Sequence, residues 1–171
     1  MLRVDGRLVL SPTDLTKHVA CPHITALDLE ALGSGADTAG TNAPDDALNL
    51  IFAKGLNHEN EYLTHLRDQG LKIVEIAGFG TDRAAAESAT LDAMRDGADV
   101  IYQATLFDRA WVGHADFLIR TKRPSVLGAW SYDIADTRLA RRLKVPALLQ
   151  MATYAVRLTE LQGAPPCTWS W

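Results

Sequence analysis

The sequence predicts a mixed α/β (α+β) fold in which helices cover a central sheet, and three observations predict it. Long stretches with helical periodicity alternate with short apolar or alternating runs that are typical of strands. Three strand-like runs (99–107, 111–119 and 126–137) follow one another with only short turns between them, which indicates a meander. Neither an internal repeat nor a linker divides the 171 residues. We therefore expect a single domain over residues 1–171.

The N-terminal part is expected to be helical. Ser11-Pro12-Thr13-Asp14 combines an N-cap hydroxyl, a proline in the first turn and an acidic residue, which predicts a helix over residues 12–31. The segment 33–44 is rich in Gly, Ala, Asp and Thr and predicts a surface loop. A second helix is predicted over residues 46–69. Its apolar stripe consists of Leu50, Ile51, Tyr62, Leu63 and Leu66.

The remainder alternates between the two kinds of element. Residues 71–76 alternate in polarity and predict a strand, and Thr81 is expected to cap a helix that ends at Gly97. The meander follows, with turns at 108–110 and 121–124. A last helix is predicted over 146–161, and the ending 165–171 is expected to begin one more strand.

Composition limits the class of protein. With 47% apolar and 22% charged residues, the chain is globular. It has no apolar run of the roughly 18–20 residues that a membrane span needs, and no signal-peptide core, so we expect a cytoplasmic protein without a membrane partner. A net charge of −4 works against non-specific affinity for polyanions. The strongest basic patch, 138–144, is either a local nucleic-acid contact or a solvated start of a helix.

Two acidic residues stand in apolar surroundings. Asp116 interrupts the apolar run 112–119, and Asp136 ends the next run, two residues before Arg138. A buried carboxylate is costly unless it is hydrogen-bonded, paired or bound to a metal. If the two strands are neighbours, both carboxylates can converge on a hard cation such as Mg²⁺. The alternative is a structural Asp–Arg ion pair, since Asp136 and Arg138 share a strand face.

Other polar residues have helical spacing. His58 and Tyr62 lie one turn apart, and Gly55 weakens the helix there, which indicates a close approach. Gln150 and Tyr154 are spaced i, i+4 and can reach one point. The sequence contains no phosphate-binding loop, no zinc-type Cys-x-x-Cys pair and no serine nucleophile elbow.

Four segments in this order resemble the PD-(D/E)XK nuclease superfamily, specifically its RecB-like branch. They are Gly55-Leu56-Asn57-His58-Glu59, Gly113-His114-Ala115-Asp116, Asp136-Thr137-Arg138 and Gln150-Met151-Ala152-Thr153-Tyr154. The opening around Leu10–Leu15, the pair Cys21-Pro22 and the segment from Tyr132 to Leu143 are also similar to this branch. The similarity runs from about residue 9 to 161.

The resemblance implies a restriction-endonuclease-like core of a helix, a three-stranded meander, a helix and a further strand. It implies a Mg²⁺- or Mn²⁺-dependent deoxyribonuclease, of an exonuclease or DNA repair and processing type. By position, His58, Asp116 and Asp136 would be metal ligands, with Asp116, Asp136 and Arg138 as the catalytic set. Arg138 stands where the motif has lysine. Gln150 and Tyr154 would orient the substrate or the motif.

The chain departs from this pattern in three ways. Arginine stays charged at any working pH, so Arg138 stabilises charge but cannot act as a neutral amine. The iron–sulfur staple of some relatives needs four cysteines, and the chain has only Cys21 and Cys167, so it cannot complete a cluster alone. It also stops shortly after the Gln150–Tyr154 helix, which suggests a member truncated at its C-terminus.

Three functions remain open at this stage. The first is a metal-dependent DNA nuclease, whose partners would be DNA and a separately encoded helicase or remaining nuclease portion. The second is a catalytically impaired RecB-like module that serves nucleic-acid binding or assembly. The third is an unrelated α+β protein in which the acidic residues form a structural ion pair.

Overall fold

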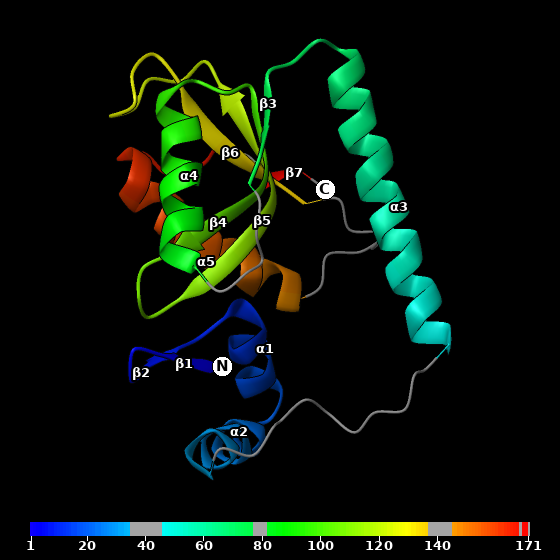
Figure 1. Cartoon of the computed structure of the whole chain (residues 1–171), viewed down its shortest axis with the longest axis vertical. Helices are drawn as coiled ribbons and strands as arrows, with labels where there is room; N and C mark the ends of the chain where they lie inside the picture. Colours follow the sequence, from blue (N-terminus) through cyan, green and yellow to red (C-terminus); the bar gives the residue numbers. More distant parts are fainter. Residues whose placement is uncertain (35–45, 77–81, 137–144, 168, 171) are drawn as a thin grey trace.

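A computed structural model of the chain describes residues 1–34, 46–76, 82–136, 145–167 and 169–170 (Figure 1). The architecture is mixed α/β, as the sequence predicted. In chain order the elements are β1 (Leu2–Val4), β2 (Arg7–Val9), α1 (Pro12–Ala20), α2 (Pro22–Ser34), α3 (Asp46–Asp68), β3 (Ile73–Glu75), α4 (Arg83–Arg95), β4 (Val100–Phe107), β5 (Val112–Thr121), β6 (Ser131–Ala135), α5 (Val145–Gln162) and β7 (Trp169–Ser170).

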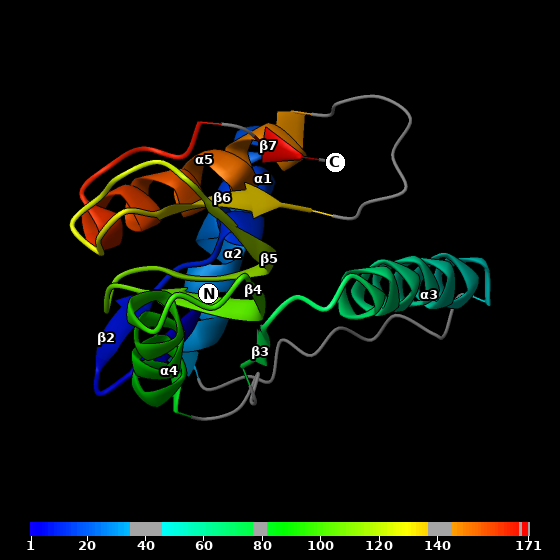
Figure 2. The same cartoon turned by 90° about the horizontal axis from the view of Figure 1, so that it is seen from above.

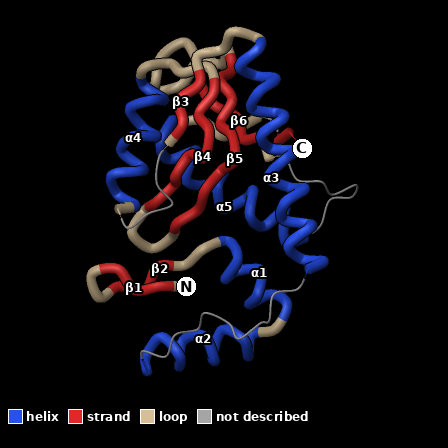
Figure 3. Tube along the Cα trace, turned by 45° about the vertical axis from the view of Figure 1, so that its right-hand side comes forward, coloured by secondary structure: helices blue, strands red, loops and turns tan. Residues whose placement is uncertain are grey.

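The central sheet has the strand order β3-β4-β5-β6-β7. The inner strands β4, β5 and β6 form the expected antiparallel meander. The outer strands are parallel to their neighbours, β3 to β4 and β7 to β6. The predicted final strand is therefore present, and helix α5 makes the crossover between the parallel strands β6 and β7 (Figure 3).

Helices cover both faces of this sheet. Figure 2 shows α4 and α5 on one face and α3 on the other. The face under α4 and α5 carries the main core, with Met94, Ile101, Leu118 and Met151 fully buried. The face under α3 carries a smaller core. Its members include Leu63, Leu66, Val100, Phe117 and Ala135.

The first predicted helix is wrong in one respect, because it consists of two helices. Cys21 between α1 and α2 has extended backbone angles, φ −161 and ψ 106. A residue that precedes proline is sterically excluded from the helical region, and Pro22 follows Cys21. The proline then starts α2 at its first turn, where a missing N–H does no harm. The predicted start of α1 is correct, since Ser11 and Asp14 form a capping box.

Two further boundaries differ from the prediction. The run 126–137 is not a strand throughout, because residues 126–130 form a turn and β6 begins at Ser131. Helix α4 is capped by Asp82, whose side chain accepts a hydrogen bond from the Ala85 N–H, while the expected cap Thr81 lies outside the described residues. The helix ends at Gly97 as expected, with φ +66 at that glycine. The predicted loop 33–44 falls mostly outside the described residues.

Side chains satisfy the backbone where the sheet has no neighbouring strand. Beyond β3, the Thr90 hydroxyl accepts from the Thr105 N–H, and the Glu87 carboxylate accepts from the Phe107 N–H. At β6, the amide of the fully buried Gln162 bonds both the N–H and the carbonyl of Tyr132. Because an unpaired buried backbone group is costly, these contacts fix α4 and α5 against the sheet. Among the described helices, none combines the length and apolarity that a bilayer crossing requires.

Candidate functional site

The two acidic residues singled out in the sequence belong to neighbouring strands. Strands β5 and β6 pair in an antiparallel register that joins Leu118 to Ile134 and Phe117 to Ala135. Asp116 precedes Phe117 in β5, and Asp136 follows Ala135 as the first residue after β6, so both lie beside the end of this pairing. Asp136 is buried, with 4% of its surface exposed, and Asp116 is half-buried.

The strand β4 has an irregular residue beside Asp116. Gln103 has φ +56, in the left-handed region that residues other than glycine rarely occupy. The register of β4 and β5 joins Tyr102 to Phe117 and Ala104 to Ala115, which places Gln103 opposite Asp116. Gln103 and Asp116 thus stand side by side on β4 and β5, and Asp136 follows the last paired residue of β6; we call these three residues the acidic row.

The irregularity turns side chains from one face of the sheet to the other. In β4, Ile101 and Ala104 both belong to the core under α4 and α5, although strict alternation would put them on opposite faces. In β5, Ala115 and Leu118 do the same. The two residues between each pair are therefore available to the face under α3. Tyr102 and Phe117 pack there, and Gln103 and Asp116 stand beside them.

Helix α3 brings a further carboxylate to this row. The Gln103 side-chain amide donates a hydrogen bond to the Glu59 carboxylate. Burial and a hydrogen bond with Glu59 raise the pKa of the nearby Tyr102, opposed by Gln103, and the charges of Glu59 and Asp116 raise it further. Tyr62, one turn after Glu59, packs edge-on against Phe117 with ring centroids 5.1 Å apart. Glu59 therefore lies near the acidic row, on the face of the sheet that α3 covers.

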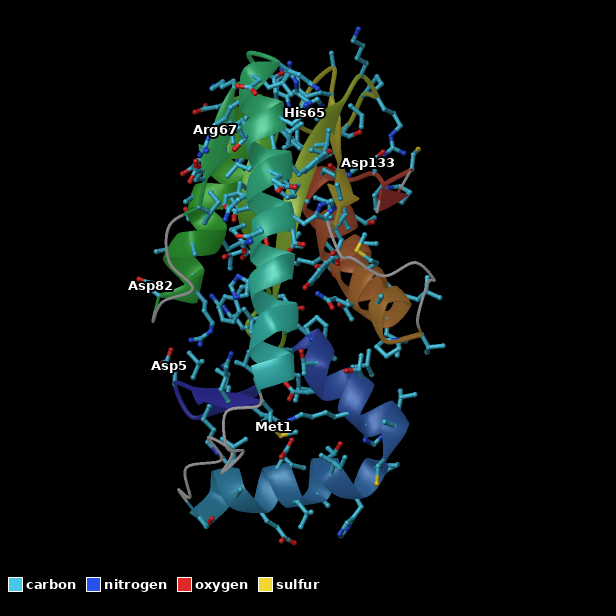
Figure 4. All side chains as sticks on the ribbon, turned by 90° about the vertical axis from the view of Figure 1, so that its right-hand side faces the viewer. Met1, Asp5, His65, Arg67, Asp82 and Asp133 are labelled. Carbon is cyan, nitrogen blue, oxygen red and sulfur yellow. The ribbon has the colours of Figure 1, made fainter. Side chains whose placement is uncertain are left out.

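The structure describes His58 but not Arg138. His58 lies on α3 next to Glu59 but is exposed, whereas Glu59 is half-buried against the sheet. Figure 4 looks onto α3 where it lies over the sheet and labels His65 and Arg67 near its C-terminal end. Arg138 lies outside the described residues, as does the basic segment 138–144 to which it belongs.

His114 also lies on the α3 side of β5, two residues before Asp116. Its Nδ1 lies 3.1 Å from the hydroxyl of Thr105 on β4. Burial lowers the pKa of His114, and the positive charge of Arg83 lowers it further. Sequence reasoning did not single out His114, Gln103 or Glu59. The His-x-Asp spacing within a strand was a usable signal for His114, because residues i and i+2 share a face. No comparable signal marked Gln103.

Gln150 and Tyr154 meet each other, as their spacing predicted. The Gln150 side-chain amide donates a 2.6 Å hydrogen bond to the Tyr154 hydroxyl. The Tyr154 ring lies on Gly113 of β5, so close that a Cβ at this glycine would be 2.3 Å from a ring carbon. Tyr154 is 5% exposed and belongs to the core under α4 and α5. These residues thus support the segment that carries Asp116 from behind the sheet.

The donor set suits a hard divalent cation. Asp116, Asp136 and Glu59 offer only carboxylate oxygens, and Mg²⁺ is typically held by one or two carboxylates with water and substrate phosphate completing its shell. Asp116 and Asp136 supply two carboxylates of this kind. Across the ranges that the structure describes, however, no three His, Cys, Asp or Glu side chains group closely enough to hold a metal ion. The two described cysteines, Cys21 and Cys167, are both free thiols.

Comparison with known proteins adds no relative to this picture. No protein-family model, curated protein or solved structure matches the chain.

Proposed function

We propose that this chain is a metal-dependent DNA nuclease domain with a restriction-endonuclease-like core, of the RecB-like kind. The observation that carries the proposal is the position of Asp116 and Asp136, which adjoin Phe117 and Ala135, the last residues that β5 and β6 pair. The meander β4-β5-β6, the helix α5 and the parallel strand β7 also occur in the order that the resemblance implies. Glu59 and Gln103 then border the pair of acidic residues from α3 and β4.

In this function each residue has a defined task. Asp116 and Asp136 would hold the cation, and Glu59, which accepts a hydrogen bond from Gln103, does not complete a three-residue metal cluster among the described residues. His58 remains a candidate ligand on the exposed side of α3. A Mg²⁺ or Mn²⁺ ion held there would supply Lewis-acid chemistry, by making water more acidic and by offsetting the charge of the phosphate. Arg138 would stabilise the charge that develops on the phosphate oxygens, and it cannot take up a proton. Gln150 and Tyr154 hold the β5 segment in place.

A cleavage assay tests the proposal. The purified chain is incubated with linear DNA and Mn²⁺ or Mg²⁺, together with Asp116→Asn, Asp136→Asn and the control Asp92→Asn on the exposed face of α4. We expect metal-dependent cleavage that falls at least roughly 10²-fold in the first two variants and stays unchanged in the control. Cleavage that survives both substitutions would remove the carboxylate pair from the mechanism.

A second candidate function is a catalytically impaired module that binds nucleic acid or supports assembly. Two observations favour it: Arg138 at the lysine position of the motif, and the lack of a three-residue metal cluster within the described residues. Under this alternative the wild type binds DNA without cutting it. The substitution Arg138→Lys separates the two functions. It would raise the cleavage rate many-fold only if the native arginine limits an existing nuclease activity.

A further inference from the structure

Three arginines from separate elements line one pocket of about 610 Å³. They are Arg7 on β2, Arg83 at the start of α4, and Arg109 in the turn after β4. Figure 4 labels Asp5 and Asp82, which also line this pocket, on the same side of the molecule. The pocket therefore lies where the β1–β2 hairpin, the start of α4 and the β4–β5 turn come together.

The guanidinium groups in this pocket do not take part in ion pairs. This holds for all three within the described part of the chain. Of the six other described arginines, all but Arg3 lie within 4.0 Å of a carboxylate: Arg67, Arg95, Arg120, Arg123 and Arg157. Of the two acidic residues in the pocket, Asp82 is engaged with the Ala85 N–H as the cap of α4. Three cations against two carboxylates leave a local charge of +1 in a chain whose net charge is −4.

The pocket lies beside the end of β4, the strand that also carries Gln103. Phe107, which lines it, follows Gln103 along β4 by four residues, with Thr105 between them on the same face. Four residues of strand span about 13 Å. Arg83 also acts electrostatically on His114, the residue paired with Thr105. A strand of nucleic acid that reaches from the acidic row to the pocket would cover about four nucleotides at the B-form rise.

Guanidinium groups suit phosphate for geometric reasons. Their planar N–H groups bind two phosphate oxygens at once, and they stay charged at any working pH. The pocket also includes the first turn of α4, where Asp82 already accepts the hydrogen bond of the Ala85 N–H. We propose that this pocket holds a backbone phosphate of the nucleic-acid strand, a few nucleotides away from the bond that is cut. The inference rests on the proposed function for the nucleic-acid ligand and for the position of that bond.

Binding measured without metal tests the pocket apart from the chemistry. Fluorescence anisotropy with a labelled DNA oligonucleotide in EDTA gives the affinity at several salt concentrations. We expect Arg83→Gln and Arg109→Gln each to weaken binding several-fold and to lower the slope of log K against log salt by about 1. The matched control is Arg95→Gln at the opposite end of α4. Arg109 is exposed in a turn, so its variant tests the pocket even if Arg83→Gln impairs folding.

The outcomes distinguish this inference from the proposed function. Failure of the wild type to bind DNA at low salt, or equal losses in Arg95→Gln and the pocket variants, would overturn the inference. Metal-dependent cleavage that persists with unaltered affinity in both pocket variants would also overturn it while leaving the nuclease intact. Arginine-dependent binding combined with cleavage that ignores Asp116→Asn would leave the pocket standing and remove the proposed nuclease site.

Discussion

Gln103 shows how a single backbone angle arranges the acidic row. A residue other than glycine in the left-handed region costs about 1–2 kcal/mol. Gln103 adopts that conformation in the middle of β4, opposite Asp116, and its amide reaches Glu59 of α3. Backbone strain of this kind persists where the surrounding structure enforces it, and it occurs often at functional sites. The left-handed turn is the physical cause of the change in facing along β4.

This conformation reverses an ordinary rule about strand residues. Glycine within a strand is normally destabilising relative to alanine by roughly 0.5–1 kcal/mol. At position 103 we expect Gln103→Gly to be more stable than Gln103→Ala by about 1 kcal/mol, because both lose the contact with Glu59 and only glycine relieves the strain. Urea denaturation of the two variants measures the difference. Greater stability of the alanine variant would show that the native angle is not strained.

Tyr132 links stability to alkaline pH. Burial raises the pKa of its phenol to about 12, and the hydroxyl donates a 2.7 Å hydrogen bond to the Ala98 carbonyl. Because the ordinary tyrosine pKa is about 10, the contribution is complete below pH 10 and is lost as the pH rises from 10 to 12. We therefore expect the wild type to be more stable than Tyr132→Phe by roughly 1 kcal/mol at pH 8. At pH 11 the difference between their unfolding free energies should be smaller. A constant difference at both pH values would contradict this.

At the scale of elements, the packing of α5 on β5 depends on one glycine. Tyr154 fills the space that a side chain at Gly113 would need. We expect Gly113→Ala to cost about 1–3 kcal/mol, since the buried tyrosine ring must shift. Gly33→Ala in α2 is the matched control, because no atom lies within 4 Å of its Cβ position. Thermal unfolding should show a loss at position 113 and no loss at position 33. Equal effects would mean that the close contact is not tight.

The elements themselves were largely predictable from local signals. The helix over 46–69, the meander and the last helix follow from periodicity and turn residues, and their bounds are close to those observed. The split at Cys21 was missed although Pro22 marked it, because the apolar content of residues 12–31 outweighed the proline. The overlong strand at 126–137 was predicted from apolar content across a turn. The local sequence pattern does not indicate where a strand stops pairing with its neighbour.

The candidate site was predictable only in part. The neighbouring positions of the strands that carry or precede Asp116 and Asp136 follow from the meander, because consecutive antiparallel strands pair side by side. The position of Glu59 beside the acidic row depends on which face of α3 meets the sheet. That face is set by Tyr62, Leu63 and Leu66, which pack in the smaller core under α3. Gln103 could not be foreseen, since its role depends on a left-handed angle that glutamine seldom adopts.

At the scale of the whole molecule, cation binding should appear as stability. A ligand that binds only the folded state raises the unfolding free energy by RT ln(1 + [L]/Kd), about 2.7 kcal/mol at 100 times Kd. We expect Mn²⁺ to raise the melting temperature of the wild type and to have little effect on Asp136→Asn. Differential scanning fluorimetry with and without EDTA measures this. An equal rise in both proteins would place the cation elsewhere.

The matched irregularity of β4 and β5 has a consequence for redesign. Both strands change facing at the same rung, so their hairpin consists of an inner ladder and an outer ladder joined at Gln103 and Asp116. Shortening the outer ladder by two residues in each strand would preserve every facing in the inner one. It would also move the arginine-bearing tip roughly 7 Å inward. The distance between Arg109 and the acidic row can thus be shortened without altering the row itself.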